Sequence, residues 1–235
     1  GVNIGDSLFD EEGAKYVERI MQKAKAAALL HFPSHRASPV QERNVKFHFP
    51  IDHVITDQKP GKKGEASKDA RVGVTDDAQG IPAGWMALDI GPATRFQFSK
   101  VGASTQHARL ILYRQVIERA NTIIWNGPMV RYPLRLYVPL SFFFAGVFEM
   151  PAFSAGTLSV MCDCVRATKR GATVVIGGGD TGAATDKFYY HHSGNCGFQW
   201  QGPSLDGVFA EPISEQVTHV STGGGSSLVL LGKRY

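Results

Sequence analysis

The chain has little cysteine, with three residues in 235, at positions 162, 164 and 196. An odd number without repeated Cys-x-x-Cys spacing argues against a disulfide-stapled secreted scaffold and favours a reducing compartment. His191 and His192 lie close to Cys196, which raises the question of a metal site. The sequence offers no second well-spaced ligand pair, so this spacing argues against zinc.

Long hydrophobic runs and strong charge of one sign are also missing. The most apolar stretch, 136–148, is too short to span a bilayer and contains a proline. The polar, acidic opening GVNIGDSLFDEEG is unlike a signal peptide. The net charge is only +4, and the densest basic cluster, 59–71, contains no aromatic residues. We therefore expect a soluble cytoplasmic protein, with a plastid as the alternative location, and no nucleic-acid or membrane partner.

Helix and strand patterns alternate along much of the chain. Residues 7–28 predict an amphipathic helix with acidic residues in its first turn, where the macrodipole favours them. Residues 45–52 predict a strand that ends at Pro50, and residues 149–170 predict a second helix. Four more apolar stretches each predict a strand that ends in a glycine- or proline-containing turn: 85–92, 121–128, 172–180 and 218–225. Strands that alternate with helices predict a largely parallel sheet.

The stretch TVVIGGGDTG, residues 173–182, carries the strongest local signal. The β-branched run 173–176 predicts a strand that is covered on both faces. Gly177, Gly178 and Gly179 then remove every side chain at the turn, so a phosphate could approach the backbone N–H groups. Two alternatives remain open. One is a tight turn where glycine merely eases helix packing, and the other is a dinucleotide-binding G-x-G-x-x-G motif completed by Gly182.

Two observations weaken the dinucleotide interpretation. The motif lies late in the chain instead of in a first βαβ unit, and no acidic residue ends a strand some twenty positions later. The sequence also contains no GxxxxGK[ST], so it carries no Walker A loop.

Five motifs follow one another in a specific order: GWMALDIGP, TIIWNGPM, GVFEM, VVIGGGDT and THVSTGGGSSLVLL. With GDSLFDEEGAKYVERIMQKAKA and NVKFHFPIDHVITD before them, they resemble the C-terminal, nucleotide-binding half of phosphoglycerate kinase. The resemblance implies an incomplete three-layer α/β fold, in which a mostly parallel, Rossmann-like sheet is flanked by helices. It covers most of 1–26, 44–57, 80–100, 116–129, 146–187 and 215–231.

The resemblance also implies where the nucleoside would bind. Leu8, Ala87 and Leu88 would line the adenine slot, although the family usually has glycine where this chain has Ala87, and the added methyl could crowd the base. Asn126 and Pro128 would border the nucleotide.

The remaining roles concern the ribose and the phosphates. Glu149 would hydrogen-bond the ribose hydroxyls, and its alternative is a solvent-facing helix residue. Gly178, Gly179, Asp180 and Thr181 would contact the phosphates, with Asp180 as the Mg²⁺ ligand because a bare carboxylate would repel them. The alternative for Asp180 is a helix N-cap. The residues expected to act in the transfer itself are Gly179, Thr181 and Gly224, the last at a second helix N-terminus.

Four segments interrupt the family pattern. We expect a single partial domain over 1–235 with insertions at 27–43, 101–115, 130–145 and 188–214, the last read as a long aromatic loop. The middle two could be translated introns, because valine codons begin with GT and a Phe-rich end can encode a pyrimidine tract before AG. True loops are the alternative.

The expected activity is phosphoryl transfer, ATP + 3-phosphoglycerate ⇌ ADP + 1,3-bisphosphoglycerate, with Mg²⁺, as in glycolysis. The family's N-terminal domain and transfer-site lysines are not found in this sequence, so 3-phosphoglycerate would bind only if that domain were supplied. We expect a monomer with little turnover in isolation. The alternatives are a non-catalytic fragment that binds adenine nucleotides and, more remotely, an NAD-binding dehydrogenase domain.

Overall fold

The structure is a computed structural model. It describes residues 2–7, 9–29, 47–58, 70–95, 113–127, 148, 150–190, 196–198, 211–221 and 223, with the backbone alone for 24–29 and 196–198. The chain divides into two compact units, Leu8–Phe49 and Gly1–Ser7 with Pro50–Tyr235. Each unit is described by itself below.

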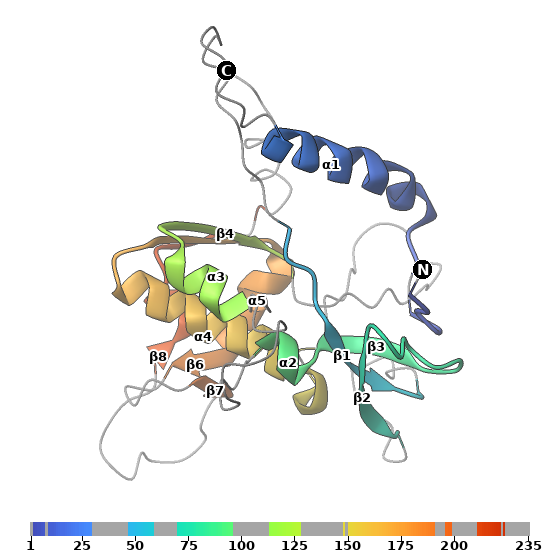
Figure 1. Ribbon diagram of the computed structural model, residues 1–235. Coiled ribbons are helices and arrows are strands. Elements are labelled where there is room, and N and C mark those ends of the chain that lie inside the picture. Colours follow the sequence, from blue (N-terminus) through green and yellow to red (C-terminus); the bar gives the residue numbers. More distant parts are fainter. Residues whose placement is uncertain are drawn as a thin grey trace, which may run out of the picture. The chain divides into compact units, whose positions relative to one another are not determined.

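The smaller unit contains helix α1, Glu11–Leu29 (Figure 1). Asp10 caps it, because its Oδ1 accepts a hydrogen bond from the N–H of Gly13 at 2.9 Å. Glu11 and Glu12 then occupy the first turn, where negative charge is stabilised. The predicted helix is confirmed, but it begins at Glu11, directly after the capping residue Asp10, and not at residue 7.

The predicted strand 45–52 is wrong in position. Residues 47–50 are not part of a strand, and Phe47 and Phe49 stack on each other at 5.9 Å while both stay exposed. Strand β1 is Asp52–Thr56, which begins after Pro50. Its residues are mostly buried, whereas the alternating phenylalanines before the proline meet no core, so pairing starts only at Asp52.

The described residues of the larger unit form three small sheets. In the first, β1 pairs antiparallel with both β2, Val72–Asp76, and β3, Met86–Ile90. The expectation that 85–92 joins a parallel sheet is therefore wrong. An apolar run such as Met86–Ile90 suits either direction of pairing, and the antiparallel partner β1 lies only some thirty residues earlier in the chain.

The second sheet is parallel, as predicted, with the order β4-β5-β9. Its strands are Thr122–Asn126, Thr173–Gly177 and His219–Ser221. Val174 and Ile176 are fully buried, whereas Thr173 is exposed and Val175 only half-buried. The expectation of a strand covered on both faces therefore holds for one face only. The α/β fold class is confirmed.

Helix α4, Ala155–Lys169, covers the buried face of this sheet (Figure 1). Met161, Cys164 and Val165 on α4 have no exposed surface and share one core with Val174 and Ile176. Burial of each such side chain contributes about 1.5–3 kcal/mol. This core fixes where β5 ends and the next helix begins.

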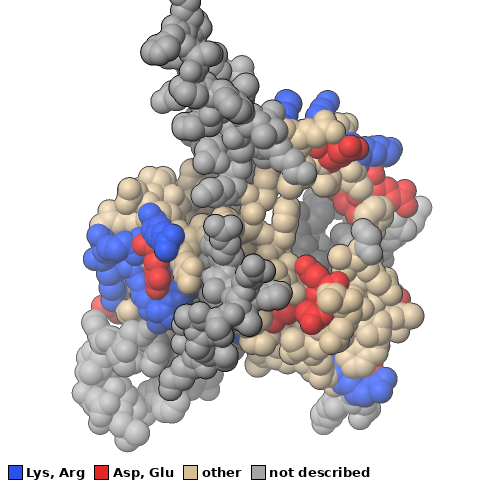
Figure 2. Space-filling view, in the orientation of Figure 1, with Lys and Arg blue, Asp and Glu red and all other residues tan. Residues whose placement is uncertain are grey.

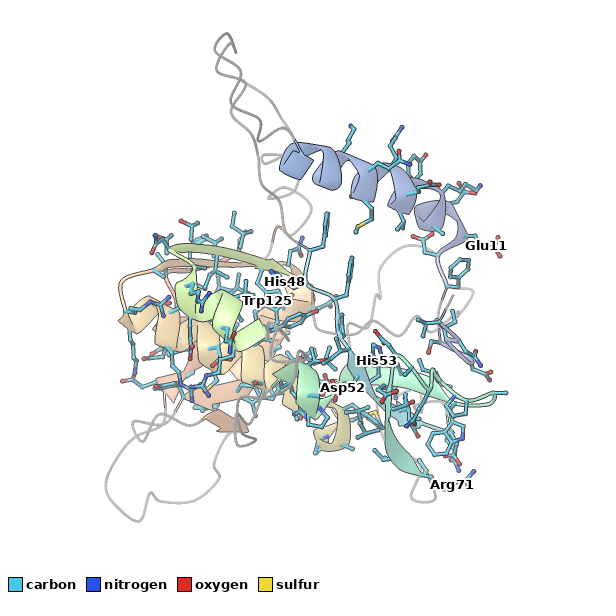
Figure 3. All side chains as sticks on the ribbon, viewed as in Figure 1. Glu11, His48, Asp52, His53, Arg71 and Trp125 are labelled. Atoms are coloured by element: carbon cyan, nitrogen blue, oxygen red, sulfur yellow. The ribbon has the colours of Figure 1, made fainter. Side chains whose placement is uncertain are left out.

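Shorter helices complete the unit. They are α2 (Pro92–Arg95), α3 (Tyr113–Arg119), the 3-10 helix η2 (Pro151–Phe153), α5 (Gly179–Lys187) and α6 (Ile213–Gln216). Buried Asp52 caps α2, because its two carboxylate oxygens accept from the N–H groups of Ala93 and Thr94 at 2.7 Å each (Figure 3). The cap ties β1 to the segment that follows β3.

The third sheet corrects the prediction for 188–214. Strand β6, Phe188–Tyr190, pairs antiparallel with β7, Cys196–Phe198, and with β8, Glu211–Pro212. Phe188 and Tyr190 are buried while Tyr189 between them is half-buried, the alternation of a strand. The described part of this stretch is therefore paired strand, followed by the start of α6 at Ile213.

The other expected insertions fall mostly outside the described residues. Segment 130–145 lies wholly outside them. Of 27–43, residues 27–29 are the last of α1, and of 101–115, residues 113–115 open α3. Within the described part of the chain, no helix is both long enough and apolar enough to cross a membrane.

Candidate nucleotide-binding site

Three parallel strands end side by side at the glycine turn. Asn126 at the end of β4 pairs with Gly177 at the end of β5, and Gly177 pairs with Ser221 at the end of β9. The carboxyl ends of parallel strands are where ligands bind in open α/β sheets. The candidate site is built on these ends.

Gly178 is a glycine for two separate reasons. Its φ of +101° lies in a region that side chains rarely adopt, and an added Cβ would lie 2.8 Å from Oδ1 of Asn126. Its N–H donates to the carbonyl of Ser221 at 3.0 Å. This amide is satisfied inside the protein, so the expectation that Gly178 offers its N–H to a phosphate is wrong.

The first turn of α5 exposes a backbone donor at Gly179. Gly182 is the first residue of α5 whose N–H bonds back along the chain, to the carbonyl of Gly178 at 2.8 Å. Among the described residues, none accepts a hydrogen bond from the N–H of Gly179. Gly179 is exposed, and a Cβ built on it meets nothing within 4 Å. Free N–H groups at the positive end of a helix form an anion-binding site.

Thr181 fixes the geometry of this turn and has no exposed surface of its own. The side chain is fully buried, and its Oγ1 accepts a hydrogen bond from the N–H of Gly127 at 2.9 Å. Gly127 has a φ of +104°, and its carbonyl accepts from Nε1 of Trp125 at 2.6 Å. The turn after β4 is thus fixed to the first turn of α5. Trp125 itself is 7% exposed and belongs to the hydrophobic core.

Asp180 lies half-buried in the same first turn, next to the open donor at Gly179. The N-cap residue of α5 is Gly178, and no side chain caps this helix end. Asp180 lies inside the helix, so its alternative role as the N-cap residue is excluded. The described residues contain no group of three or more metal-ligating side chains. A Mg²⁺ ion that arrives with its nucleotide needs only one or two protein carboxylates, a role that Asp180 suits.

Two residues of the expected adenine slot lie on β3. Ala87 is half-buried, and its N–H donates to Oγ of Ser7 at 3.0 Å. Leu88 is 1% exposed and packs in a cluster with Val54, Met86, Met150 and Phe153. Ala87 therefore has surface to offer a base, whereas Leu88 lies behind it in the core.

The other expected site residues are Leu8, Pro128, Glu149 and Gly224, and they lie outside the described residues. Next to Gly224, the N–H of Gly223 donates to Oγ of Ser221 at 3.2 Å. Ser221 thus contacts two turns. Its carbonyl accepts from Gly178 in the turn after β5, and its hydroxyl accepts from Gly223 just after β9. Sequence reasoning missed Ser221, although its place at the end of a predicted strand was a usable signal.

Basic side chains gather over α3 and the end of α4 (Figure 2). Arg166 pairs with buried Asp163 at 2.7 Å, and Arg114 pairs with Glu118 at 2.8 Å. Burial raises the pKa of Asp163, and the Arg166 hydrogen bond opposes that rise. Arg170, just after α4, donates to the carbonyl of Ile117 in α3 and to that of Ala120, the residue after α3. With the 3.8 Å pair between Arg114 and Asp163, these bonds join α3 to α4.

The fold and the turn define an α/β protein in which a parallel strand runs through a glycine turn into a helix N-terminus. A family model for phosphoglycerate kinase matches residues 1–233. The chain belongs to the phosphoglycerate kinase family.

Individual relatives agree with the family match. The chain is 36% identical over 230 residues to phosphoglycerate kinase from Yarrowia lipolytica and also to that from Schistosoma mansoni. It is 35% identical over 230 residues to phosphoglycerate kinase 2 from Sus scrofa. Each match covers 98% of this chain but 37% of the relative, so the chain spans about a third of the length of these proteins.

Proposed function

We propose that the chain binds ADP or ATP as the Mg²⁺ complex and carries the nucleotide side of the phosphoglycerate kinase reaction. The observation that supports this most directly is the first turn of α5, where exposed Gly179 has open space around it and its N–H faces no described acceptor. This N–H group follows a buried parallel strand in a family of kinases. The proposed reaction of the complete protein is ATP + 3-phosphoglycerate ⇌ ADP + 1,3-bisphosphoglycerate.

Phosphoryl transfer depends on positioning and on cancelling negative charge more than on covalent chemistry. In this proposal the N–H of exposed Gly179 binds the phosphates, with Thr181 directly behind it, helped by a helix end worth about 0.3–1 kcal/mol toward an anion. Bound Mg²⁺ would neutralise phosphate charge, and Asp180 would hold it. The buried Thr181 side chain positions its own backbone by accepting from Gly127.

The nucleoside would extend away from this turn. Ala87 would contact the base, Asn126 would border the nucleotide, and Leu88 would support Ala87 from the core. The remaining proposed contacts are Leu8 to the base, Pro128 to the nucleotide, Glu149 to the ribose, and Gly224 at the second helix N-terminus. We propose a monomer in the cytoplasm that acts in glycolysis.

A second candidate function is nucleotide binding without turnover. The chain spans 37% of its relatives' length, which favours this candidate for the polypeptide taken alone. A coupled assay on the purified chain separates the two, because measurable turnover eliminates the binding-only function.

The proposed binding is tested by calorimetric titration with ADP–Mg²⁺ on two variants of one residue. G179P removes a single N–H donor at the first helical position, where proline is tolerated. G179A keeps the donor and adds a methyl group into open space. We expect wild type and G179A to bind alike and G179P to bind at least tenfold more weakly.

Equal binding by all three proteins, or no binding by wild type, would overturn the proposal.

Titration of a chain that lacks 130–145 shows whether that segment limits the affinity for ADP–Mg²⁺. A gain in affinity on removal would identify the segment as an obstacle.

A further inference from the structure

Strand β3 contains a β-bulge that turns three consecutive side chains inward. Val54 of β1 pairs with Asp89 and Ile55 pairs with Ala87, so Leu88 is the extra residue between them. Leu88, Asp89 and Ile90 are each 1% exposed, so burial does not alternate along this end of the strand. Bulges of this kind re-aim side chains beside functional sites.

The side chain re-aimed by the bulge is a carboxylate, and it reaches the start of α4. Oδ2 of Asp89 accepts from the N–H of Gly156 at 2.7 Å, and Oδ1 accepts from the N–H of Ile90 at 2.9 Å. Ser154, at the N-cap position of α4, makes no side-chain cap. Asp89 on strand β3 therefore supplies the hydrogen-bond acceptor that the N-terminus of α4 lacks locally.

The contact tolerates no larger residue on the helix side. A Cβ on Gly156 would lie 2.0 Å from Oδ1 of Asp89 and 2.5 Å from Cγ1 of Ile90. Beside it, Met86 and Leu88 of β3 pack with Met150 and Phe153, the residues that lead into α4. We call the Asp89–Gly156 contact, with this packing, the β3–α4 clamp.

Both sides of the clamp carry residues of the proposed nucleoside contacts. Ala87 lies two residues before Asp89 on β3. Glu149, the proposed ribose contact, stands in the sequence between Phe148 and Met150, whose side chains are each 3% exposed. The phosphate-binding turn, by contrast, is built on β4, β5 and β9.

We propose that Asp89 is a positioning residue for the adenosine end of the nucleotide, and that it acts through the β3–α4 clamp without touching the ligand. This inference rests on the proposed function, because it concerns how the same site distinguishes a nucleotide from bare phosphates.

The test compares two probes, ADP–Mg²⁺ and pyrophosphate–Mg²⁺, by calorimetry on the full chain. D89N leaves one carbonyl oxygen where two oxygens now accept, and G156A forces the clamp apart from the helix side. D163N is the matched control. Asp163 is also a buried aspartate and lies on α4, but its partner is Arg166 and not the clamp.

We expect D89N and G156A to weaken ADP binding about five- to tenfold while pyrophosphate binding stays within twofold of wild type. Retained pyrophosphate binding also shows that each variant has folded. D163N should leave the ratio of the two affinities unchanged.

Three results would overturn the inference: equal loss of both ligands in D89N, a D163N variant with the same selective loss, or unchanged ADP binding in both clamp variants. Failure of wild type to bind either probe is a different result, because it removes the proposed function and the inference with it.

Discussion

The backbone N–H of Gly127 and the hydroxyl of Thr181 are joined by a hydrogen bond of 2.9 Å. The two residues are 54 positions apart in sequence, one just after β4 and the other in the first turn of α5. Because Thr181 is fully buried, this bond satisfies a donor that would otherwise have no partner there. It also sets the separation between the ends of two neighbouring strands.

The first prediction concerns this bond. T181V removes the acceptor and keeps the shape, which leaves the Gly127 donor unsatisfied, so we expect a loss of about 1–3 kcal/mol in the free energy of unfolding. Urea unfolding measures it. T181S keeps the oxygen and should retain most of that stability, and a T181S variant as unstable as T181V would contradict the role of the hydroxyl.

The second prediction concerns the conformation of Gly178. G178A must adopt a φ near +101° and also bring a methyl group within 2.8 Å of Asn126 Oδ1, so we expect destabilisation by about 1–3 kcal/mol. G182A is the control, because its Cβ meets only Val220 at an ordinary 3.6 Å in a helix interior. That variant should be more stable than wild type by about 0.5–1 kcal/mol. Thermal unfolding of both variants checks the contrast.

The third prediction follows from Asp89 and pH. Burial raises the pKa of Asp89 from 3.8 to about 6, against the opposing effect of its hydrogen bonds from Gly156 and Ile90. The folded protein therefore holds this proton more tightly than the unfolded chain. The resulting stabilisation is fully present below pH 4 and is lost as the pH rises through about 6, with a total on the order of 3 kcal/mol.

Urea unfolding of wild type and D89N at several pH values between 4 and 8 isolates this contribution. The difference in free energy of unfolding between the two proteins should shift in favour of D89N as the pH rises. Asp163, whose pKa is also raised, is present in both proteins and cancels from the comparison. A difference that is constant with pH would show that Asp89 does not titrate in this range.

The fourth prediction concerns the metal ligand. If Asp180 holds Mg²⁺ on the bound nucleotide, D180N should bind ADP–Mg²⁺ several-fold more weakly and should bind metal-free ADP as well as wild type or better, since a repelling charge is gone. Titrations with and without EDTA give both affinities. Equal weakening under the two conditions would indicate a structural role for the carboxylate.

Elements with a strong local signal were predictable from the sequence. The strands at 122–126 and 173–177 each combine β-branched residues with a following glycine, and both form at the predicted places with parallel pairing. The body of α1 and the long helix α4 have similarly local causes, whereas the start of α1 was expected at residue 7 and lies at Glu11. Strand direction in β3 was not predictable, because Met86–Ile90 suits either pairing. The strands β6 to β8 were missed because each has only two or three residues.

The candidate site shows the same division between local and long-range causes. The need for glycine at 178 follows from the local sequence, and the structure agrees. The start of α5 at Gly179, ahead of the alternative N-cap Asp180, did not follow from it. The partner of the Gly178 amide did not follow, because the carbonyl of Ser221 lies 43 residues further along the chain. The Asp89–Gly156 contact spans 67 residues and depends on a bulge that periodicity alone does not reveal.

The bond from Gly178 to Ser221 has a consequence for biosynthesis. A nascent chain on the ribosome can complete β4 and β5 and still lack the carbonyl that fixes the glycine turn, because β9 ends at residue 221. The glycine turn therefore gains its final geometry only after nearly all of these 235 residues have been translated and have left the exit tunnel.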